Sequence, residues 1–341
     1  MVLDGCGLSS YSLPVVVGLN FLSVNFIMFP SLKFSIVTPS YNQAPFLEQA
    51  IRSVQEQDYS CFEHFVFDGG STDGSVDIIR KYADRLTCWV SEKDGGQSDS
   101  INKGWARSTG DILAWLNSDD IYLPGALRAV AKTFATNPQA VAVVGDCLRV
   151  DKSGNKIGRE VIGRMDLYSL LTCDQTIAQP AVFVRRQVYE TIGGLNSNLY
   201  YALDWDYWIR LALHFSPGRV CRLPVTLAAA RRWGGAKTVT GVERICEEKR
   251  SILTSLFDRG LLPPEVQQRR AIAFSLTYWW QAFLERKAGR SWDARRHAWQ
   301  AWRMAPEEFS IWRLLRFWIK TFTPSPVVTL RHRIADYVRG D

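Results

Sequence analysis

From Lys33 onward, short apolar segments alternate with longer segments of helical periodicity, and polar turns separate them. Strands are predicted at 34–38, 62–67, 87–91, 112–116 and 141–144, and helices near 45–57, 74–85, 97–108 and 124–136. Short connections of this kind are typical of a mostly parallel, doubly wound sheet with helices on both faces. The sequence therefore predicts a Rossmann-like α/β fold.

After Asp146 the alternation becomes less regular. The polar cluster 151–155 predicts a hairpin turn, later strands are expected near 179–185 and 219–229, and the chain from about Gly241 onward is predicted to be helical. We therefore expect an N-terminal extension over 1–32, a catalytic α/β domain over 33–240 and a helical region over 241–341.

The first 32 residues carry a single charge, Asp4, and an apolar run over 13–29 that Asn20 and Asn25 interrupt. No positive segment precedes the run and no small-residue cleavage site follows it, so a secretory signal is not indicated. Two interpretations stay open. The segment is either an extension upstream of a start at Met28 or a weak membrane-touching anchor.

The net charge of +7 comes from one part of the chain, because residues 240–341 hold 18 Lys and Arg against 11 Asp and Glu. This part also contains seven of the 13 tryptophans. In 311–320 the apolar residues Ile311, Leu314, Leu315 and Trp318 follow helical spacing. A basic helix with tryptophans indicates peripheral contact with an anionic membrane, and the alternative is a bundle that packs its tryptophans on the catalytic domain. Without a nucleic-acid-binding motif, no nucleic acid partner is expected.

The seven cysteines are scattered and never spaced as CxxC, which argues against a disulfide framework or a zinc site. We interpret them as reduced thiols. The expected location is the cytoplasm, including the cytoplasmic face of the membrane.

Ligands of open α/β sheets bind beyond the carboxyl ends of the strands, so the residues after each strand are informative. The segment after the first strand lacks the glycines of a dinucleotide fingerprint, which disfavours NAD binding. Asp68 opens a glycine-rich turn, and Asp119 and Asp120 are adjacent carboxylates that would repel each other unless a cation lay between them. Hard oxygen ligands suit Mg²⁺ or Mn²⁺ holding a diphosphate. The plainer interpretations are a helix cap at Asp73 and a simple turn at Asp120.

Five motifs occur in one order: Thr38-Pro39-Ser40-Tyr41-Asn42, Asp68-Gly69-Gly70-Ser71-Thr72-Asp73, Gly96-Gln97 with Asn102-Lys103-Gly104, Asn117-Ser118-Asp119-Asp120, and Asp204-Trp205-Asp206-Tyr207-Trp208-Ile209-Arg210. Over roughly 33–235 the chain thereby resembles glycosyltransferase family 2, whose members have the GT-A fold. The resemblance implies inverting transfer from a nucleotide-diphosphate sugar to a hydroxyl of a saccharide or lipid-linked acceptor, in polysaccharide or glycolipid biosynthesis, with Mg²⁺ or Mn²⁺.

The resemblance also implies residue roles. Asp68 would contact the base, Asp119 the ribose or sugar, and Asp120 the metal, while Asp204 would be the general base. The remaining donor-site candidates are Thr38, Pro39, Tyr41, Gly96, Gln97, Asn102 and Asn117, and weaker candidates for the acceptor or phosphate side are Asp206, Trp208, Arg231 and Lys237. A helix cap at Asp204 and a core position for Trp208 are the plainer alternatives.

Three positions depart from the family pattern. Leu203 stands where a Glu commonly precedes the catalytic Asp, Asn117 replaces the first Asp of the DxD motif, and Trp233 occupies the place of a His in a later loop. The metal assignment therefore depends on Asp120, with cationic help at the phosphates from Arg231, Arg232 or Lys237. The alternative function is a catalytically silent relative that binds a nucleotide sugar or polysaccharide.

Overall fold

The computed structural model describes residues 31–172, 177–260 and 262–322. The expectations for the N-terminal apolar run therefore lie outside the described residues. Within the described part of the chain, no helix is both long enough and apolar enough to cross a membrane.

A nine-stranded sheet forms the centre of the described chain, in the order β3-β2-β1-β4-β8-β6-β9-β5, with β7 paired to β6. The first four strands of this order are mutually parallel, β8 is antiparallel to both of its neighbours, and β6 is parallel to β9. The strands are β1 Phe34–Ser40, β2 Phe62–Asp68, β3 Cys88–Ser91, β4 Ile112–Trp115, β5 Ile121–Tyr122, β6 Ala142–Val150, β7 Lys156–Glu160, β8 Val182–Arg185 and β9 Val220–Arg231. The predicted α/β class is confirmed.

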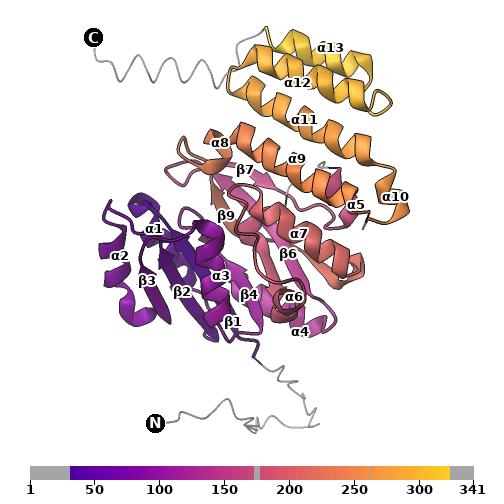
Figure 1. The fold of residues 1–341 in the computed structure, drawn as a ribbon. Coiled ribbons are helices and arrows are strands. Elements are labelled where there is room, and N and C mark those ends of the chain that lie inside the picture. The colour runs from indigo at the N-terminus through magenta and orange to yellow at the C-terminus, as the bar shows by residue number, and fades with distance from the viewer. Residues whose placement is uncertain (1–30, 173–176, 261, 323–341) are drawn as a thin grey trace, which may run out of the picture. The chain divides into compact units, whose positions relative to one another are not determined.

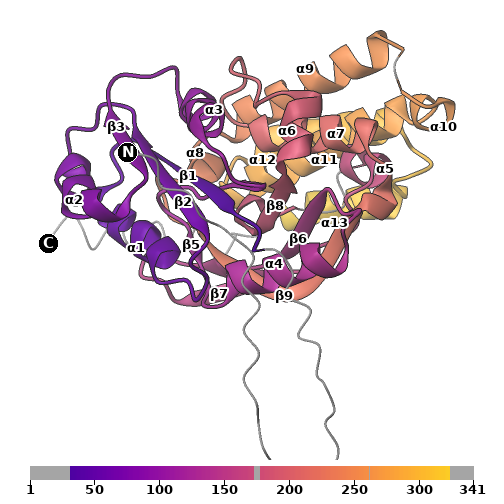
Figure 2. The ribbon, with the colours of Figure 1, turned by 90° about the horizontal axis from the view of Figure 1, so that it is seen from below.

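Helices cover both faces of this sheet, as Figure 2 shows. One face carries α1 (Ala44–Gln55), α2 (Ser75–Lys81) and α4 (Ala126–Thr136), and the other carries α3 (Gln97–Arg107), α6 (Arg186–Ile192) and α7 (Leu203–His214). Because side chains of a strand alternate between faces, neighbours on β1 enter different cores. Val37 packs in the core of α3, α6 and α7, whereas Ile36 packs in the core of α1 and α4.

Close approach of α3 to β1 explains one glycine of the predicted donor motifs. A Cβ on Gly104 would lie 2.5 Å from the Val37 side chain, closer than two carbon atoms can pack. Gly104 is therefore required by packing of the helix on the strand.

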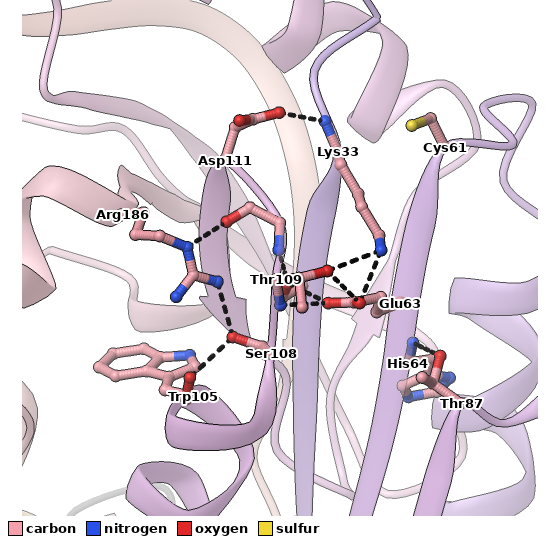
Figure 3. Close-up of polar contacts among 12 residues, drawn as sticks. Lys33, Cys61, Glu63, His64, Thr87, Trp105, Ser108, Thr109, Asp111 and Arg186 are labelled. Atoms are coloured by element: carbon pink, nitrogen blue, oxygen red, sulfur yellow. Dashed lines mark hydrogen bonds and ion pairs between the residues drawn. The ribbon is translucent and has the colours of Figure 1, made fainter. Parts of the chain in front are cut away.

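The amino ends of the central strands are tied together by a polar network around Glu63 (Figure 3). Its carboxylate accepts hydrogen bonds from Ser35 Oγ and from the backbone and hydroxyl of Thr109, and it pairs with Lys33 Nζ at 2.7 Å. Burial alone would raise the pKa of Glu63, but the bonds from Lys33 and Thr109 lower it to about 2. This network fixes the edge of the sheet that lies opposite the candidate site.

The predicted hairpin at 151–155 is present between β6 and β7, which are antiparallel. Asp151 Oδ1 accepts the backbone N–H groups of Ser153 and Asn155, as an Asx turn requires. Sequence patterning missed the two-residue β5 and the two extra residues at the end of β1. Both differences lie near the site.

The segment after Gly241 is helical up to Lys320 except for short connections, as predicted. It contains α9 (Val242–Asp258), α10 (Pro264–Gln267), α11 (Arg270–Lys287), α12 (Ser291–Met304) and α13 (Ile311–Lys320). In Figure 1 these helices form a stack in which α9 packs on α11, α11 on α12 and α12 on α13. Ile252, Leu253 and Phe257 of α9 belong to the same core as Leu203 of α7, so the stack begins as a continuation of the catalytic core.

Candidate active site

The carboxyl ends of β1, β2 and β3 are in register, with Ser40 beside Asp68 and Asp68 beside Ser91. β1 continues through Ser40, two residues beyond its predicted end. Thr38 and Pro39 therefore lie inside the strand and are buried, and Thr38 Oγ1 is 3.0 Å from His64 Nε2. The Thr38 side chain has no exposed surface, and a contact of Thr38 or Pro39 with the donor stays a prediction. Tyr41 follows the strand and is 62% exposed, so its role stays a prediction.

Asp68 holds the glycine-rich loop that follows β2. Its carboxylate accepts from the backbone N–H groups of Gly70 and Ser71 and from the hydroxyls of Ser71 and Ser91. These four bonds satisfy both oxygens and leave Asp68 2% exposed. The loop is thus built around Asp68, and a contact between this carboxylate and a base stays a prediction.

The Asp68 loop adjoins the loop before α3. A Cβ on Gly69 would lie 3.1 Å from Asp94 Oδ1, and this oxygen accepts the backbone N–H of Gly96. Gly96 has a φ of 99°, a conformation that L side chains rarely adopt. Two predicted donor motifs, which are separated in the sequence, are therefore side by side at the sheet edge.

A chain of side-chain hydrogen bonds crosses this edge from α8 (Lys237–Thr240) to the end of β4. Lys237 Nζ donates to Gln97 Oε1 at 2.9 Å, and Gln97 Nε2 donates to Asn117 Oδ1 at 2.7 Å. Asn117 Nδ2 then donates to Asp120 Oδ2 at 3.2 Å. Four predicted site residues from three separate motifs are thus joined in one network.

Lys237 supplies the cation of this network. Its ammonium group lies 3.8 Å from the centre of the Tyr200 ring, a cation–π contact. Burial lowers the pKa of Lys237 to about 8, and the carboxylates of Asp119, Glu248 and Asp94 oppose the shift. Tyr200 and Glu248 were not singled out by sequence reasoning.

Asp119 and Asp120 sit at different depths. Asp120 is 6% exposed, and its Oδ1 accepts the backbone N–H of Arg231 at 3.0 Å. Burial, and next the neighbouring Asp119 carboxylate, raise the pKa of Asp120 to about 8. Asp119 is only partly buried, and Trp233 Nε1 donates to its Oδ2 at 3.1 Å. Trp233, at the place of the expected His, thus acts as a neutral donor to the acidic pair.

Arg231 is a structural clamp in the described chain. Its guanidinium donates to the backbone oxygens of Asp119, Asp151 and Lys152 and to Gln49 Oε1. The side chain is 5% exposed and lies over the Phe46 ring. Arg231 thus joins the acidic loop to α1 and to the β6–β7 turn, and a further contact of Arg231 with phosphate stays a prediction.

Asp204 occupies the first turn of α7, where Ala202 is the cap position and makes no side-chain cap bond. Asp204 Oδ1 accepts the N–H of Trp205 at 2.7 Å, so it does not cap the helix in the usual manner. Burial raises the pKa of Asp204, and the cations of Lys249 and Arg232 oppose the shift. The Arg232 cation also opposes the shift at Asp120, so its field reaches both carboxyl groups.

Glu248 of α9 caps α7 from outside. Its carboxylate accepts three successive backbone N–H groups, those of Tyr200, Tyr201 and Ala202, at 2.8–2.9 Å. These N–H groups lie two to four residues before Asp204 and lead into the start of α7, so α9 fixes the position of the predicted base. The sequence contains no local signal for this contact, because Glu248 is one of several charges on an amphipathic helix.

Three further predicted residues have structural partners instead of an open site. Asn102 makes two hydrogen bonds with the backbone of Leu195, and Asp206 pairs with Arg210 at 2.8 Å. Trp208 is 2% exposed and stacks on Trp115 with ring centres 5.5 Å apart. Trp208 therefore occupies the core position that was the plainer alternative, and a role at an acceptor site stays a prediction.

The described residues contain no group of three or more His, Cys, Asp or Glu side chains that could hold a metal by themselves. Asp119 and Asp120 offer the carboxylate oxygens that Mg²⁺ and Mn²⁺ prefer. The like-charge interaction that raises the pKa of Asp120 would be relieved by a cation. Asp119 and Asp120 would therefore fit a divalent ion, which would supply positive charge beside a diphosphate.

Comparison with known proteins identifies the family. The sequence profile described as "Glycosyl transferase family 2" matches residues 35–192. A "PGL/p-HBAD biosynthesis glycosyltransferase" of Mycobacterium bovis is 32% identical over 207 residues, which are 59% of this chain and 78% of that protein. A protein of the same description occurs in Mycobacterium tuberculosis with the same identity and coverage.

Two solved structures share the fold. One is S. aureus TarS 1-349 in complex with UDP-GlcNAc, with a TM-score of 0.57, 18% identity, and coverage of 81% of this chain and 82% of that chain. The other is the mannosyltransferase PcManGT from Pyrobaculum calidifontis in complex with GDP-Man and Mn²⁺, with a TM-score of 0.55, 18% identity, and coverage of 85% and 86%. The sheet is thus the GT-A type that the resemblance implied, and the chain belongs to glycosyltransferase family 2 and is a glycosyltransferase.

Proposed function

We propose that this glycosyltransferase moves a sugar, with inversion, from a nucleotide-diphosphate sugar to a hydroxyl group of a saccharide or lipid-linked acceptor in polysaccharide or glycolipid biosynthesis. The observation that carries the proposal is the network that joins Lys237, Gln97, Asn117 and Asp120 at one edge of the sheet. It sets a partly buried ammonium group and a pair of carboxylates on the same small surface. A neutral or singly charged ligand would not require both the ammonium group and the pair of carboxylates.

The ammonium group of Lys237 is suited to a departing diphosphate. As the bond between the sugar C1 and the diphosphate oxygen breaks, negative charge grows on that oxygen, and a nearby cation stabilises it most where water is excluded. Lys237 is held by Gln97 and by the Tyr200 ring, so it needs little reorganisation. The complexes of TarS with UDP-GlcNAc and of PcManGT with GDP-Man support a donor of this chemical class.

Asp204 is the proposed general base. In a single displacement, the acceptor oxygen attacks C1 on the face opposite the diphosphate, and its proton passes to Asp204. Burial raises the pKa of Asp204, which makes it a stronger proton acceptor than an exposed carboxylate. The products are the glycosylated acceptor, with inverted configuration at C1, and the nucleoside diphosphate.

A Mg²⁺ or Mn²⁺ ion bound at Asp120 would neutralise the diphosphate. The test measures the affinity of a nucleoside diphosphate with and without Mn²⁺ for wild type and for Asp120→Ala. We expect Mn²⁺ to increase the affinity of wild type and to have no effect on the variant. An unchanged Mn²⁺ response in a folded Asp120→Ala protein would remove Asp120 from this role.

Transfer itself is tested by incubating the full chain with UDP- and GDP-linked sugars and measuring release of UDP or GDP, with and without candidate acceptors. We expect release that an acceptor stimulates, and the anomeric configuration of the product, read by NMR, should be inverted. Saturable donor binding without release under any acceptor would instead favour the catalytically silent relative, for which Leu203 and Trp233 are the sequence support. Retained configuration would contradict the single displacement.

A further inference from the structure

Helix α13 has three longitudinal faces, and only one of them is buried. Leu314 and Phe317 pack inward and are 1% and 7% exposed. A second face is apolar and exposed, and it consists of Ile311, Trp312, Leu315, Ile319 and, just after the helix, Phe322. At about 100° per residue these positions fall within a single narrow sector. The predicted apolar stripe is thus divided, because Leu314 enters the bundle whereas Ile311 and Leu315 face outward.

The third face is basic and borders a groove. Arg313, Arg316 and Lys320 lie between the buried and the exposed apolar faces of α13. With Trp279, Phe283 and Arg286 of α11 they line a groove of about 640 Å³. Four of these residues are cationic and none is acidic. We call this groove, together with the exposed apolar face of α13, the α13 surface.

The composition of the α13 surface selects one class of partner. Four exposed large apolar side chains on one short helix, with Phe322 just after it, exceed the scattered apolar residues of an ordinary surface. A protein partner of matching charge would need acidic residues around an apolar centre, whereas anionic lipid presents phosphates beside acyl chains over any area. Arg313 is already held above the Trp279 and Phe309 rings, so the basic rim keeps a fixed position beside the apolar face.

We propose that the α13 surface docks the protein on the headgroup layer of an anionic membrane. The apolar face, with Trp312, Ile319 and Phe322 outermost, enters the boundary between headgroups and acyl chains. Arg286, Arg316 and Lys320 then meet lipid phosphates at the level of the groove. This inference goes beyond the proposed transfer reaction and does not depend on it, because none of these residues belongs to the catalytic network.

The test uses the full chain and two types of vesicle, phosphatidylcholine alone and phosphatidylcholine with about one third phosphatidylglycerol. Wild type should co-sediment with the anionic vesicles and be released by high salt. The double substitution Arg316→Glu/Lys320→Glu should weaken this binding by at least about tenfold, since each base near the surface contributes about 1 kcal/mol. Trp312→Ser/Ile319→Ser should also weaken it, because both side chains are more than 60% exposed and insert rather than support the fold.

Matched controls separate the α13 surface from general charge and apolarity. Lys132→Glu/Arg85→Glu reverses two exposed charges on the catalytic domain, and Ile157→Ser/Val161→Ser removes two exposed apolar side chains near β7. Both controls should bind as wild type does. All variants should keep wild-type turnover on a water-soluble acceptor, which also verifies folding; if no turnover is found for wild type, circular dichroism and thermal unfolding replace this readout.

The outcomes distinguish lipid phosphates from free inorganic phosphate as the ligand of the α13 surface. Wild-type binding by both α13 variants, or an equal loss in the controls, would overturn the proposal and move any membrane contact elsewhere in the chain. If the protein bound millimolar inorganic phosphate at the α13 surface but did not sediment with anionic vesicles, the surface would be a small-anion site. This result would also overturn the proposal. Selective loss in the two α13 variants would establish the surface.

Discussion

The candidate active site and the α13 surface both concentrate charge, but they hold it in opposite ways. At the sheet edge nearly every charged side chain has partners within the chain: Asp68 accepts four hydrogen bonds and Arg231 donates to four acceptors. On α13 the charged side chains and the apolar face around Trp312 are exposed. A preorganised network should respond to single substitutions with large effects, whereas an open surface should respond additively.

The largest expected effect is that of Asp204→Asn. Asn keeps the size and hydrogen-bonding shape of the side chain but cannot take the acceptor proton, so turnover should fall by about 10² to 10⁴-fold. Donor affinity should stay near wild type, because the base acts only in the transition state. The measurement is kcat together with donor Kd by calorimetry. Turnover within a few-fold of wild type in a folded variant would make Asp204 structural.

Glu248→Ala should have the next largest effect, because it leaves three N–H groups before Asp204 without their acceptor. We expect the free energy of unfolding to fall by about 2 to 3 kcal/mol and kcat to fall by about tenfold. Urea unfolding and steady-state kinetics measure the two effects. Glu248→Gln should recover part of both, since an amide oxygen still accepts.

The neighbouring Glu247→Ala is the matched control for Glu248, because Glu247 is exposed on the same helix. It should change neither quantity appreciably. If Glu247→Ala and Glu248→Ala gave equal losses, positioning of α7 by α9 would not be the cause.

A smaller effect is expected from pH. The pKa of Lys237 is about 8, below its usual value, so the ammonium charge is present below pH 8 and is lost as the pH rises through it. Affinity for a nucleoside diphosphate, measured in EDTA, should therefore weaken between pH 7 and pH 9.5 by up to about tenfold. Lys237→Gln should bind weakly at both pH values. An equally steep profile in Lys237→Gln would assign the pH dependence to another group.

The smallest effect is expected from Asp206→Asn, two residues from the proposed base. Asp206 forms a partly buried ion pair with Arg210, and such a pair contributes about 1 kcal/mol or less. Stability should fall by no more than this amount and kcat should be nearly unchanged. A loss of turnover equal to that of Asp204→Asn would instead assign the base to Asp206.

The sequence predicted the fold well wherever local patterning controls it. The alternation of strands and helices over 34–136 and the turn at 151–155 follow from side-chain periodicity and turn chemistry, which are local properties. The pairings of β8, β6 and β9 depend on contacts between distant segments, and no periodicity reports them. The predicted end of β1 is two residues early because Pro39 and Ser40 resemble a polar turn, whereas parallel pairing with β2 extends the strand through Ser40.

The sequence predicted which motifs meet at the candidate site more reliably than it predicted the contacts of each side chain. Motif positions brought Gln97, Asn117 and Asp120 together correctly, because strand ends share an edge of the sheet. The sequence could not distinguish an open side chain from one consumed by partners, as Arg231 and Trp208 show. It also gave no means to find Glu248, whose role depends on how α9 packs against α7.

The cap that Glu248 places on α7 has a practical meaning for anyone building chimeras of this enzyme. A junction near residue 240 would remove Glu248, the acceptor of three N–H groups, along with the C-terminal helices. The relative that supplies the new helices would rarely have an equivalent carboxylate. A junction at Gly260, after α9 and at a positive φ of 64°, keeps the cap with its own catalytic half. Exchanging α10 to α13 at that point would vary the α13 surface while Glu248 stays with α7, provided that the new helices replace Val266 and Ala273 in the shared core.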